Sequence, residues 1–495
     1  MLRQTRRSRR FVLQSMGAVA TTLIAACSAP TPAASPKPTS AVASAATAAS
    51  PVAAATPLLG GGIGGAQPTP LPTSASQLQN PVSLQAPSVK ASGPTTLTFW
   101  QYVPFHNDVQ NLIAAEYKKL DPNVSLEITA YPGLNEQRTA VKAALAAGSS
   151  TPDIIAVEPG AYCVDVALNN SVVGFGNVFQ ADPEFKQGFW PNALSLLTIN
   201  GETVSVPVVT NTVSVFYNKK LFAENNVAEP ATLDDLYKLG PVFNAKGISP
   251  LTIAFGQDRN QPLFPFYSMC GRLGADGVMR QADVGQKPWT SPELVQAATY
   301  CEQIAKSDLY AKGLLGVKEP DAIATFASGK AAMFWAGQWL RTSIRQALPV
   351  DFDLGLFPFP ALTAGGPRPT LSSVGITLTV NAKSKNPELA FEMIKAITGA
   401  WGKIEYSKGL GISPNGPISA EAIAYQMQTL KDPLYPEFLK LQPGGTSRVL
   451  FTPQVEEAMY QGMQALISGQ KSAQQVMQEV ETASQKAGER KFTVG

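Results

Sequence analysis

The chain has 495 residues, with 39 basic and 36 acidic side chains and a formal net charge of +3. Five arginines among the first ten residues account for this excess, because from residue 27 onward the chain has 34 basic and 36 acidic residues. No basic cluster remains that would indicate a nucleic-acid partner. His106 is the only histidine, which excludes a metal site built from several histidines and a histidine pair for proton transfer. We therefore expect neither a metal nor a cofactor.

The first 26 residues have the pattern of a secretory signal peptide. Arg9-Arg10, typical of twin-arginine export, precede an apolar stretch of 16 residues, which is shorter than the roughly 20 that a spanning helix needs. The stretch ends in Ile24-Ala25-Ala26-Cys27, which resembles the lipobox of bacterial lipoproteins. This resemblance implies a lipid on Cys27 and attachment to the outer face of the bacterial cytoplasmic membrane. The alternative is an ordinary signal peptide followed by an unmodified cysteine.

Residues 27–93 have the composition of a tether. Ala, Pro, Ser, Thr and Gly dominate this segment, charged residues are almost absent, and a glycine-rich run covers residues 60–65. Such a segment buries too little apolar surface to offset the entropy lost on ordering. We therefore expect it to be a disordered linker.

Strands and helices alternate in the part of the chain that follows the tether. Residues 97–100 form a short apolar run, and residues 124–130 alternate between apolar and polar side chains as a strand does. Apolar residues recur at helical spacing over residues 109–120 and again over residues 134–145. Residues 153–157 have the composition of a buried strand. This order predicts βαβ units and a largely parallel sheet.

Further along the chain, short signals mark turns and helix starts. Asn200-Gly201 predicts a tight hairpin, and Thr232 with Asp235 predicts a capping box at a helix start. Helices are expected to begin near Pro292, Pro320, Pro387 and Pro453, and a strand is expected over residues 331–335. About 400 residues follow the tether, which is enough for two lobes of an α/β protein.

Three stretches carry a resemblance to a known family. They are VPVVTNTVSVFYNKKLFAENNVAEPATLDDLYKL at residues 206–239, FASGKAAMFWAGQW at 326–339 and VDFDLGLFPFP at 350–360. The earlier segments LTFWQYV and TPDIIAV also fit. In this order, over residues 94–490, they resemble the extracellular solute-binding proteins of ABC importers, in the sugar-binding group that includes maltose-binding protein.

The resemblance implies a fold of two α/β lobes joined by crossing hinge strands, with the ligand in the cleft between them. One lobe would comprise residues 94–209 and 373–418, and the other would comprise residues 214–369 and 421–490. The hinge would include Thr210 to Ser214, and the lobes would close on the solute by a hinge motion.

The resemblance also implies the ligand-binding residues. Trp339 corresponds to a tryptophan that stacks on sugar in family members, and Asn211 corresponds to a ligand-contacting carboxylate of the maltose binder. A sugar ring has an apolar face and a rim of hydroxyl groups, so its site needs flat aromatic groups and planar polar groups. The expected ligand-binding residues are Trp100, Tyr102, Glu158, Asn211, Trp335, Trp339 and Asn415. The alternative for each is a structural role, in core packing or in hydrogen bonds to the backbone.

The sequence leaves two local questions open. Cys270 and Cys301 form either a disulfide or two buried thiols, and Cys163 is not at metal-like spacing from them. His106 lies either at the cleft or in water beside the first helix.

The function that the resemblance implies is capture of a sugar or oligosaccharide, without catalysis, by a lipid-anchored monomer that delivers it to an ABC permease. One alternative keeps the transport role and changes the solute to a polyamine or a polyol phosphate. The other is an exported glycoside hydrolase, which needs two carboxylates flanking the scissile bond. No acidic pair stands in a loop beside aromatic residues, because Asp234-Asp235 fit a helix cap and Asp351 and Asp353 fit a strand.

Overall fold

The computed structural model describes residues 80–148, 151–256, 260–410, 413–430, 434–441, 450–488, 490 and 492–494. All of them belong to the compact unit Leu59–Gly495, and the other unit, Met1–Leu58, lies outside the described residues. The expected signal peptide, Cys27 and most of the expected tether therefore also lie outside them. Within the described part, no helix is both long and apolar enough to span a membrane.

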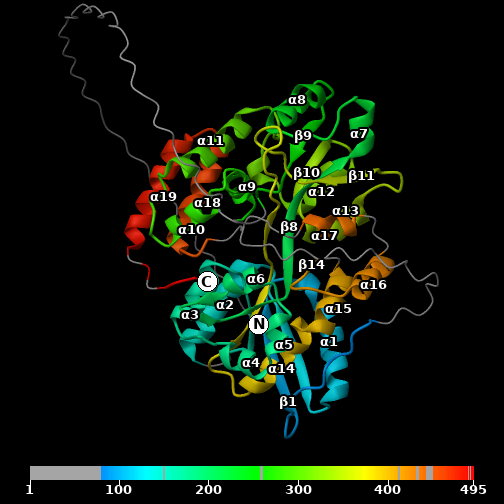
Figure 1. Cartoon of the computed structure of the whole chain (residues 1–495), viewed down its shortest axis with the longest axis vertical. Coiled ribbons are helices and arrows are strands. Elements are labelled where there is room, and N and C mark those ends of the chain that lie inside the picture. The colour runs from blue at the N-terminus through cyan, green and yellow to red at the C-terminus, as the bar shows by residue number, and fades with distance from the viewer. Residues whose placement is uncertain are drawn as a thin grey trace, which may run out of the picture. The chain divides into compact units, whose positions relative to one another are not determined.

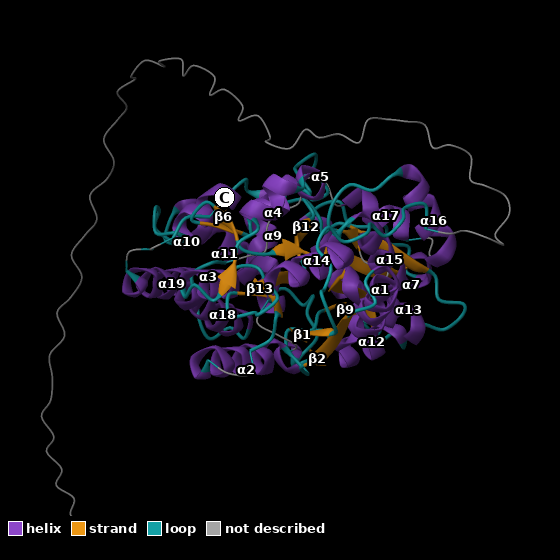
Figure 2. Ribbon diagram, turned by 90° about the horizontal axis from the view of Figure 1, so that it is seen from below, coloured by secondary structure: helices purple, strands orange, loops and turns teal. Residues whose placement is uncertain are grey.

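Two mixed sheets organise the fold, and helices lie on both sides of their strands (Figure 2). The first sheet has the order β2-β1-β3-β13-β4, with β7 paired to β13. Its strands are β1 (Thr95–Gln101), β2 (Val124–Ala130), β3 (Ile154–Val157), β4 (Val172–Val173), β7 (Val206–Pro207) and β13 (Thr377–Asn381). The second sheet has the order β11-β8-β10-β9, with β12 and β14 also paired to β8. Its strands are β8 (Val209–Asn218), β9 (Ser249–Thr252), β10 (Ala331–Gly337), β11 (Leu354–Phe357), β12 (Leu371–Val374) and β14 (Ser413–Pro414).

The helices divide between the two lobes that these sheets define. Those that precede β8, or that follow β13 up to residue 430, are α1 (Asn107–Leu120), α2 (Leu134–Ala147), α3 (Ala161–Leu168), α4 (Gly176–Ala181), α5 (Pro183–Gln187), α6 (Pro191–Ser195), α14 (Pro387–Thr398), α15 (Ala400–Leu410) and α16 (Ala420–Leu430). The others are α7 (Lys219–Glu224), α8 (Leu233–Asn244), α9 (Phe264–Arg272), α10 (Asp276–Asp283), α11 (Pro292–Lys306), α12 (Glu319–Ala327), α13 (Arg341–Ala347), α17 (Tyr435–Leu441), α18 (Pro453–Ile467) and α19 (Ala473–Ala487). Short 3₁₀ turns are η1 (Pro104–His106), η2 (Gln261–Leu263), η3 (Leu314–Gly316) and η4 (Gln338–Leu340), and β5 (Thr198–Ile199) pairs with β6 (Glu202–Thr203).

The local signals in the sequence are confirmed. The Asn200-Gly201 turn joins β5 to β6, and both of its residues have the positive φ that such a turn requires. The capping box forms at α8, where the Asp235 amide donates to Thr232 Oγ1 at 3.2 Å and the Asp235 carboxylate accepts from the Thr232 amide. The predicted helix starts at Pro292, Pro387 and Pro453 coincide with those of α11, α14 and α18.

The prediction of a largely parallel sheet is wrong. Among the strands of the described residues, only β1 with β2, β1 with β3, and β9 with β10 are parallel, whereas β13 and β8 run antiparallel to all their partners. The reason is the chain crossing: β12 pairs with β8 in the second sheet, and three residues later β13 starts in the first. β7 and β8 make the opposite crossing, and Figure 1 shows β8 as a long strand with β10 and β11 beside it.

Each sheet packs into its own apolar core. The first core contains Leu97, Phe99, Ile113, Leu378 and Ile394. The second contains Val215, Leu251, Phe266, Ile304 and Met459. The chain also passes between the lobes before α18, where Phe451 packs in a cluster with Tyr162 of the first lobe. The exact lobe boundaries expected from the sequence remain predictions.

The prediction that the tether extends to residue 93 needs correction. Residues 80–93 lie on the first lobe, where Ala91 is buried in its core and Leu84 packs against it. The Ala91 amide donates to Asp121 Oδ2 at 2.8 Å, and Asn123 Nδ2 donates to the Ala91 carbonyl at 3.1 Å. The composition of residues 80–93 is dominated by small and polar residues, so it did not reveal the few apolar and hydrogen-bonding positions that attach this segment to the first lobe.

Close packing of α14 against α15 predicts the effect of one substitution. A Cβ atom on Gly402 would lie 2.0 Å from the Ala396 carbonyl oxygen and 2.5 Å from that of Ile397, so Gly402→Ala forces the two helices apart. We expect it to lower the free energy of unfolding in urea by about 1–3 kcal/mol.

Gly277 of α10 is the matched control. A Cβ atom there would meet nothing within 4 Å, so Gly277→Ala is expected to raise the free energy of unfolding by about 0.5–1 kcal/mol. Equal effects of the two substitutions would contradict the close approach of α14 and α15.

Candidate ligand-binding site

The carboxyl ends of three parallel strands form the edge of the first lobe that carries the candidate site. Because β1, β2 and β3 are parallel, the residues at and after their ends lie at one sheet edge. Trp100 near the end of β1 meets Tyr131 after β2, with ring centroids 5.6 Å apart and an edge-to-face angle of 62°. Tyr102 and the 53% exposed Phe105 follow β1, and Glu158 follows β3. This edge therefore combines aromatic rings with a carboxylate.

A buried polar network holds the loop after β1, which comprises residues 102–107. His106 is only 2% exposed, and its Nδ1 lies 2.8 Å from the Tyr406 hydroxyl. The same hydroxyl accepts from Gln110 Nε2 at 2.8 Å, and Gln110 in turn exchanges hydrogen bonds with Gln101. The hydroxyl keeps its own hydrogen, which it can donate to His106 Nδ1 when the imidazole is neutral. Burial lowers the pKa of His106 to about 3, which keeps the imidazole neutral at physiological pH.

Both sequence-based placements of His106 are therefore wrong. It lies neither at the cleft nor in water, because its ring packs between Phe105 and Tyr406. Its place is behind the binding edge, where it supports the loop that carries Tyr102 and Phe105.

In the second lobe, Trp339 occupies η4 directly after β10. Its ring lies against Gly337, where a Cβ atom would come within 1.9 Å of it, so the glycine makes room for the indole. Its Nε1 donates to Glu319 Oε1 at 3.1 Å, and Phe264 lies edge-on with a centroid distance of 6.3 Å. The indole is therefore held in place on two sides while it remains only partly buried.

Polar side chains continue from Trp339 to the first lobe. Gln261 Nε2 donates to Glu319 Oε1 at 2.8 Å, and the neighbouring Asn260 Nδ2 donates to Glu158 Oε1 at 2.7 Å. Glu158 belongs to the first lobe and Asn260 to the second, so this hydrogen bond joins the two. We call the five residues, Glu158, Asn260, Gln261, Glu319 and Trp339, the interlobe band.

The hinge strand adds polar groups next to this band. Asn211 of β8 is in register with Ser373 of β12. Among the described residues, neither Asn211 Oδ1 nor Ser373 Oγ has a hydrogen-bond partner although both atoms are buried. Buried polar atoms are almost always paired, so two on adjacent strands indicate a position where a further hydroxyl or water belongs. On the same strand, Thr212 Oγ1 donates to Gln338 Oε1 at 3.1 Å, which ties β8 to η4 and so to Trp339.

Two of the expected ligand-binding residues lie elsewhere. Trp335 is fully buried and stacks on Phe359 at 4.0 Å, because β10 is a central strand that is buried on both faces. Asn415 is also fully buried, and its Nδ2 donates to the carbonyl oxygens of Pro207 and Thr398 at 2.7 and 3.0 Å. Both therefore have the structural roles that were the alternatives.

The structure also answers the question about the cysteines. Cys163, Cys270 and Cys301 are all buried free thiols, so the disulfide alternative is not the one adopted. Burial raises the pKa of the Cys163 thiol to about 11, which keeps it protonated and unreactive. Among the described residues, no three His, Cys, Asp or Glu side chains are grouped so that they could hold a metal ion.

Sequence reasoning missed five residues around the site. Tyr131 directly follows an alternating strand, as Trp100 ends one, so the same argument applied to β2 finds it. Phe105 carries no signal beyond its loop position. Asn260, Gln261 and Glu319 come from segments about 60 residues apart, and only the tertiary fold brings them to Trp339.

A groove of about 630 Å³ lies next to Glu319, the residue that accepts from Trp339 Nε1. It lies between α12 and α13 and is bordered by Glu319 and by Leu340, the residue after Trp339. Pro320, Ile323 and Ala324 give it an apolar wall. Its volume lies within the usual range for small-molecule sites.

The chain matches a family model described as bacterial extracellular solute-binding protein over residues 105–403. This match covers more than half of the sequence. The chain belongs to that family.

Relatives and solved structures agree with this assignment. The multiple sugar-binding protein of Streptococcus mutans is 24% identical over 304 residues, which cover 58% of this chain and 67% of that protein. The diacetylchitobiose-binding protein of Streptomyces coelicolor is 23% identical over 219 residues, 43% of this chain and 46% of that protein. The chain thus spans about half the length of several curated relatives that it matches. A maltose-bound binding protein of T. maritima superimposes with a TM-score of 0.65 and 20% identity, over 79% of this chain and 99% of that one, which shows the same two-lobed fold.

The buried state of His106 predicts an imidazole that does not titrate. As the only histidine, it gives the only imidazole signal of an untagged protein. We expect this NMR signal to keep its chemical shift from pH 8 to pH 5, because the pKa is about 3. A titration midpoint near 6.5 would contradict the burial of the ring.

The same shift makes stability depend on pH. The pKa of His106 is lower in the folded than in the unfolded chain. Below pH 6.5 the unfolded chain therefore binds a proton that the folded chain does not, and the free energy of unfolding falls as the pH falls toward 3. At pH 5 the loss should be about 2 kcal/mol. His106→Gln removes this component, so the difference in unfolding free energy between variant and wild type should change by that amount between pH 7.5 and 5.

Proposed function

We propose that this solute-binding protein captures a neutral sugar or oligosaccharide between its lobes and delivers it to an ABC permease, without chemical conversion. The observation that carries the proposal is the pairing of aromatic rings with polar groups from both lobes. The first lobe supplies Trp100 and Tyr131, the second supplies Trp339, and the interlobe band contains polar groups of both. Rings can pack on the apolar face of a sugar while amides and carboxylates bind its hydroxyl groups.

The charges near the site favour a neutral solute. Glu158 already accepts from Asn260, and Glu319 accepts from Gln261 and Trp339, so both carboxylates have donors within the protein. A polyamine would need several carboxylates without such donors, and a phosphate would need basic groups or exposed helix N-termini. The relatives whose names state a ligand bind multiple sugars, diacetylchitobiose or maltodextrin.

We propose that closure occurs about Thr210 to Ser214, where the chain crosses between lobes. We also propose that the groove beside Trp339 receives distal units of an oligosaccharide, because it continues from Glu319 and has an apolar wall with polar residues at its rim. Capture needs only micromolar affinity, about −8 kcal/mol, which a few stacked rings and hydrogen bonds can provide.

A ligand panel tests the class of solute. Thermal unfolding is measured with mono- and oligosaccharides, polyamines and sugar phosphates, since a ligand at 100 times its dissociation constant stabilises by about 2.7 kcal/mol. We expect only neutral sugars to raise the melting temperature. A shift by a charged compound alone would keep the fold and reject the proposed solute, and release of reducing sugar would reject a purely binding role.

Substitution of Trp339 tests the site. Trp339→Ala removes the stacking surface, and we expect the affinity for the sugar found in the panel to fall at least about tenfold by calorimetry, equivalent to 1.4 kcal/mol. The fold should remain, as measured by circular dichroism. The matched control is Trp335→Phe, which alters a core indole and should lower the melting temperature while leaving the affinity nearly unchanged. Unchanged binding by Trp339→Ala would remove this residue from the site.

We propose that Cys27 carries a lipid that holds the protein at the outer face of the cytoplasmic membrane. The support is the signal-like sequence ending in Ile24-Ala25-Ala26. A labelled fatty acid fed to the producing bacterium should be incorporated into the wild type and into Cys163→Ser, but not into Cys27→Ala, which should be released into the medium. Labelling of Cys27→Ala would refute the anchor at this residue.

A further inference from the structure

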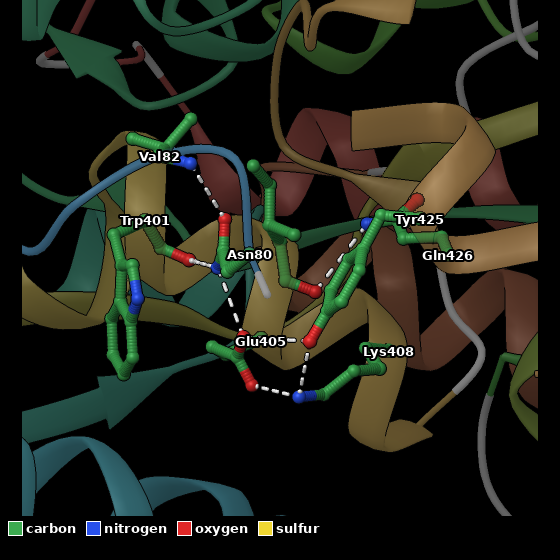
Figure 3. A network of polar contacts seen from close by, with 8 residues as sticks. Asn80, Val82, Trp401, Glu405, Lys408, Tyr425 and Gln426 are labelled. Carbon is green, nitrogen blue, oxygen red and sulfur yellow. Dashed lines mark hydrogen bonds and ion pairs between the residues drawn. The ribbon is translucent and has the colours of Figure 1, made fainter. Parts of the chain in front are cut away.

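Residues 80–93, which we call the strap, lie in a seat of three buried carboxylates. Asn80 Nδ2 donates to Glu405 Oε1 of α15 at 2.9 Å (Figure 3). The Ser88 amide donates to Glu392 Oε2 of α14 at 3.2 Å, and the Ala91 amide donates to Asp121 Oδ2 at 2.8 Å. These carboxylates, Glu405, Glu392 and Asp121, are 4%, 7% and 1% exposed. Each carboxylate also has a partner outside the strap, and the strap supplies further donors that offset the cost of burying these charges.

Apolar contacts complete the seat. Val82 packs against a cluster that contains Ile404 of α15. Leu84 and Ala91 belong to the apolar cluster that also contains Tyr406. Figure 3 shows Asn80 and Val82 lying over α15, where Glu405 is also bonded to Lys408 and Tyr425 of α16.

The residue next to Glu405 supports the binding edge. Tyr406 is fully buried, and its hydroxyl contacts His106 and Gln110, each at 2.8 Å. Consecutive helical residues point in directions about 100° apart, so α15 carries the strap on one side and the loop of residues 102–107 on another. One turn of α15 thus contacts the strap through Glu405 and the loop of Tyr102 and Phe105 through Tyr406.

We propose that the strap is a positioning element of the binding site: by fixing α15 it keeps Tyr406 on His106 and holds the loop of residues 102–107 in place. The expected effect of the strap on affinity rests on the proposed sugar binding. The expected effect of the strap on the titration of His106 does not depend on any ligand.

The test compares the exported chain, produced without lipid, as wild type and as the triple variant Asn80→Ala, Leu84→Ser, Ser88→Ala. Ser83→Ala with Gln85→Ala, two exposed positions of the same strap, is the control. The first readout is the NMR titration of the single imidazole, and the second is the sugar affinity by calorimetry. In the triple variant we expect the imidazole to begin titrating above pH 5 and the affinity to fall about fivefold, whereas the control should match the wild type.

The outcomes separate this inference from the proposed function. A lower melting temperature with an unchanged imidazole titration would show that the strap only stabilises the fold, and would overturn the inference. A changed titration with unchanged sugar affinity would overturn its link to the binding edge. If the wild type binds no sugar, the proposed function fails, and the imidazole titration still decides whether the strap positions the loop.

Discussion

The crossing strand β8 is the constraint on which the site depends. It is buried along its whole length and pairs with β10, β11, β12 and β14, so its register fixes that of the second sheet. Its alternate residues enter different cores: Val213, Val215 and Tyr217 pack in one, and Phe216 packs in another. Its first residues follow directly from β7 of the first sheet, which places Asn211 and Thr212 at the junction of the lobes. Through Thr212 and Gln338, the same strand positions the turn that presents Trp339.

Neutral polar groups support the binding edge from behind. Gln101, Gln110, Tyr406 and His106 are all buried and hydrogen-bonded to one another. None of them needs to be charged, so the network avoids the desolvation cost that a buried ion pair would carry. Burial lowers the pKa of the histidine to about 3, so its imidazole stays neutral within this network.

Local chemistry was predictable from the sequence, and long-range consequences were not. The capping box at Thr232, the hairpin at Asn200 and the helix starts at prolines all depend on neighbouring residues, and each was predicted. The antiparallel course of β13 depends on a crossing from the other lobe, which no local pattern encodes. Trp335 and Trp339 are four residues apart in one motif, but the first lies in a strand that is buried on both faces and the second lies in the partly exposed turn that follows. The strap was not predicted because the average composition of its segment does not reveal the few positions, such as Asn80 and Ala91, that bind it to the first lobe.

We propose that the interlobe band itself selects among solutes. The bond from Asn260 to Glu158 involves a charged acceptor, and such bonds contribute about 1.5–3 kcal/mol. A solute that enters between these residues must replace it on both sides, with a donor for Glu158 and an acceptor for Asn260. A hydroxyl group can do both at once, whereas an ammonium group has no acceptor and a phosphate dianion has no donor. The two buried oxygens on Asn211 and Ser373 impose a similar requirement at the hinge, since the amide oxygen needs a donor and the serine hydroxyl can donate or accept. A polyhydroxyl ring meets all of these demands without a net charge, and for this reason the band favours a neutral sugar over either charged alternative.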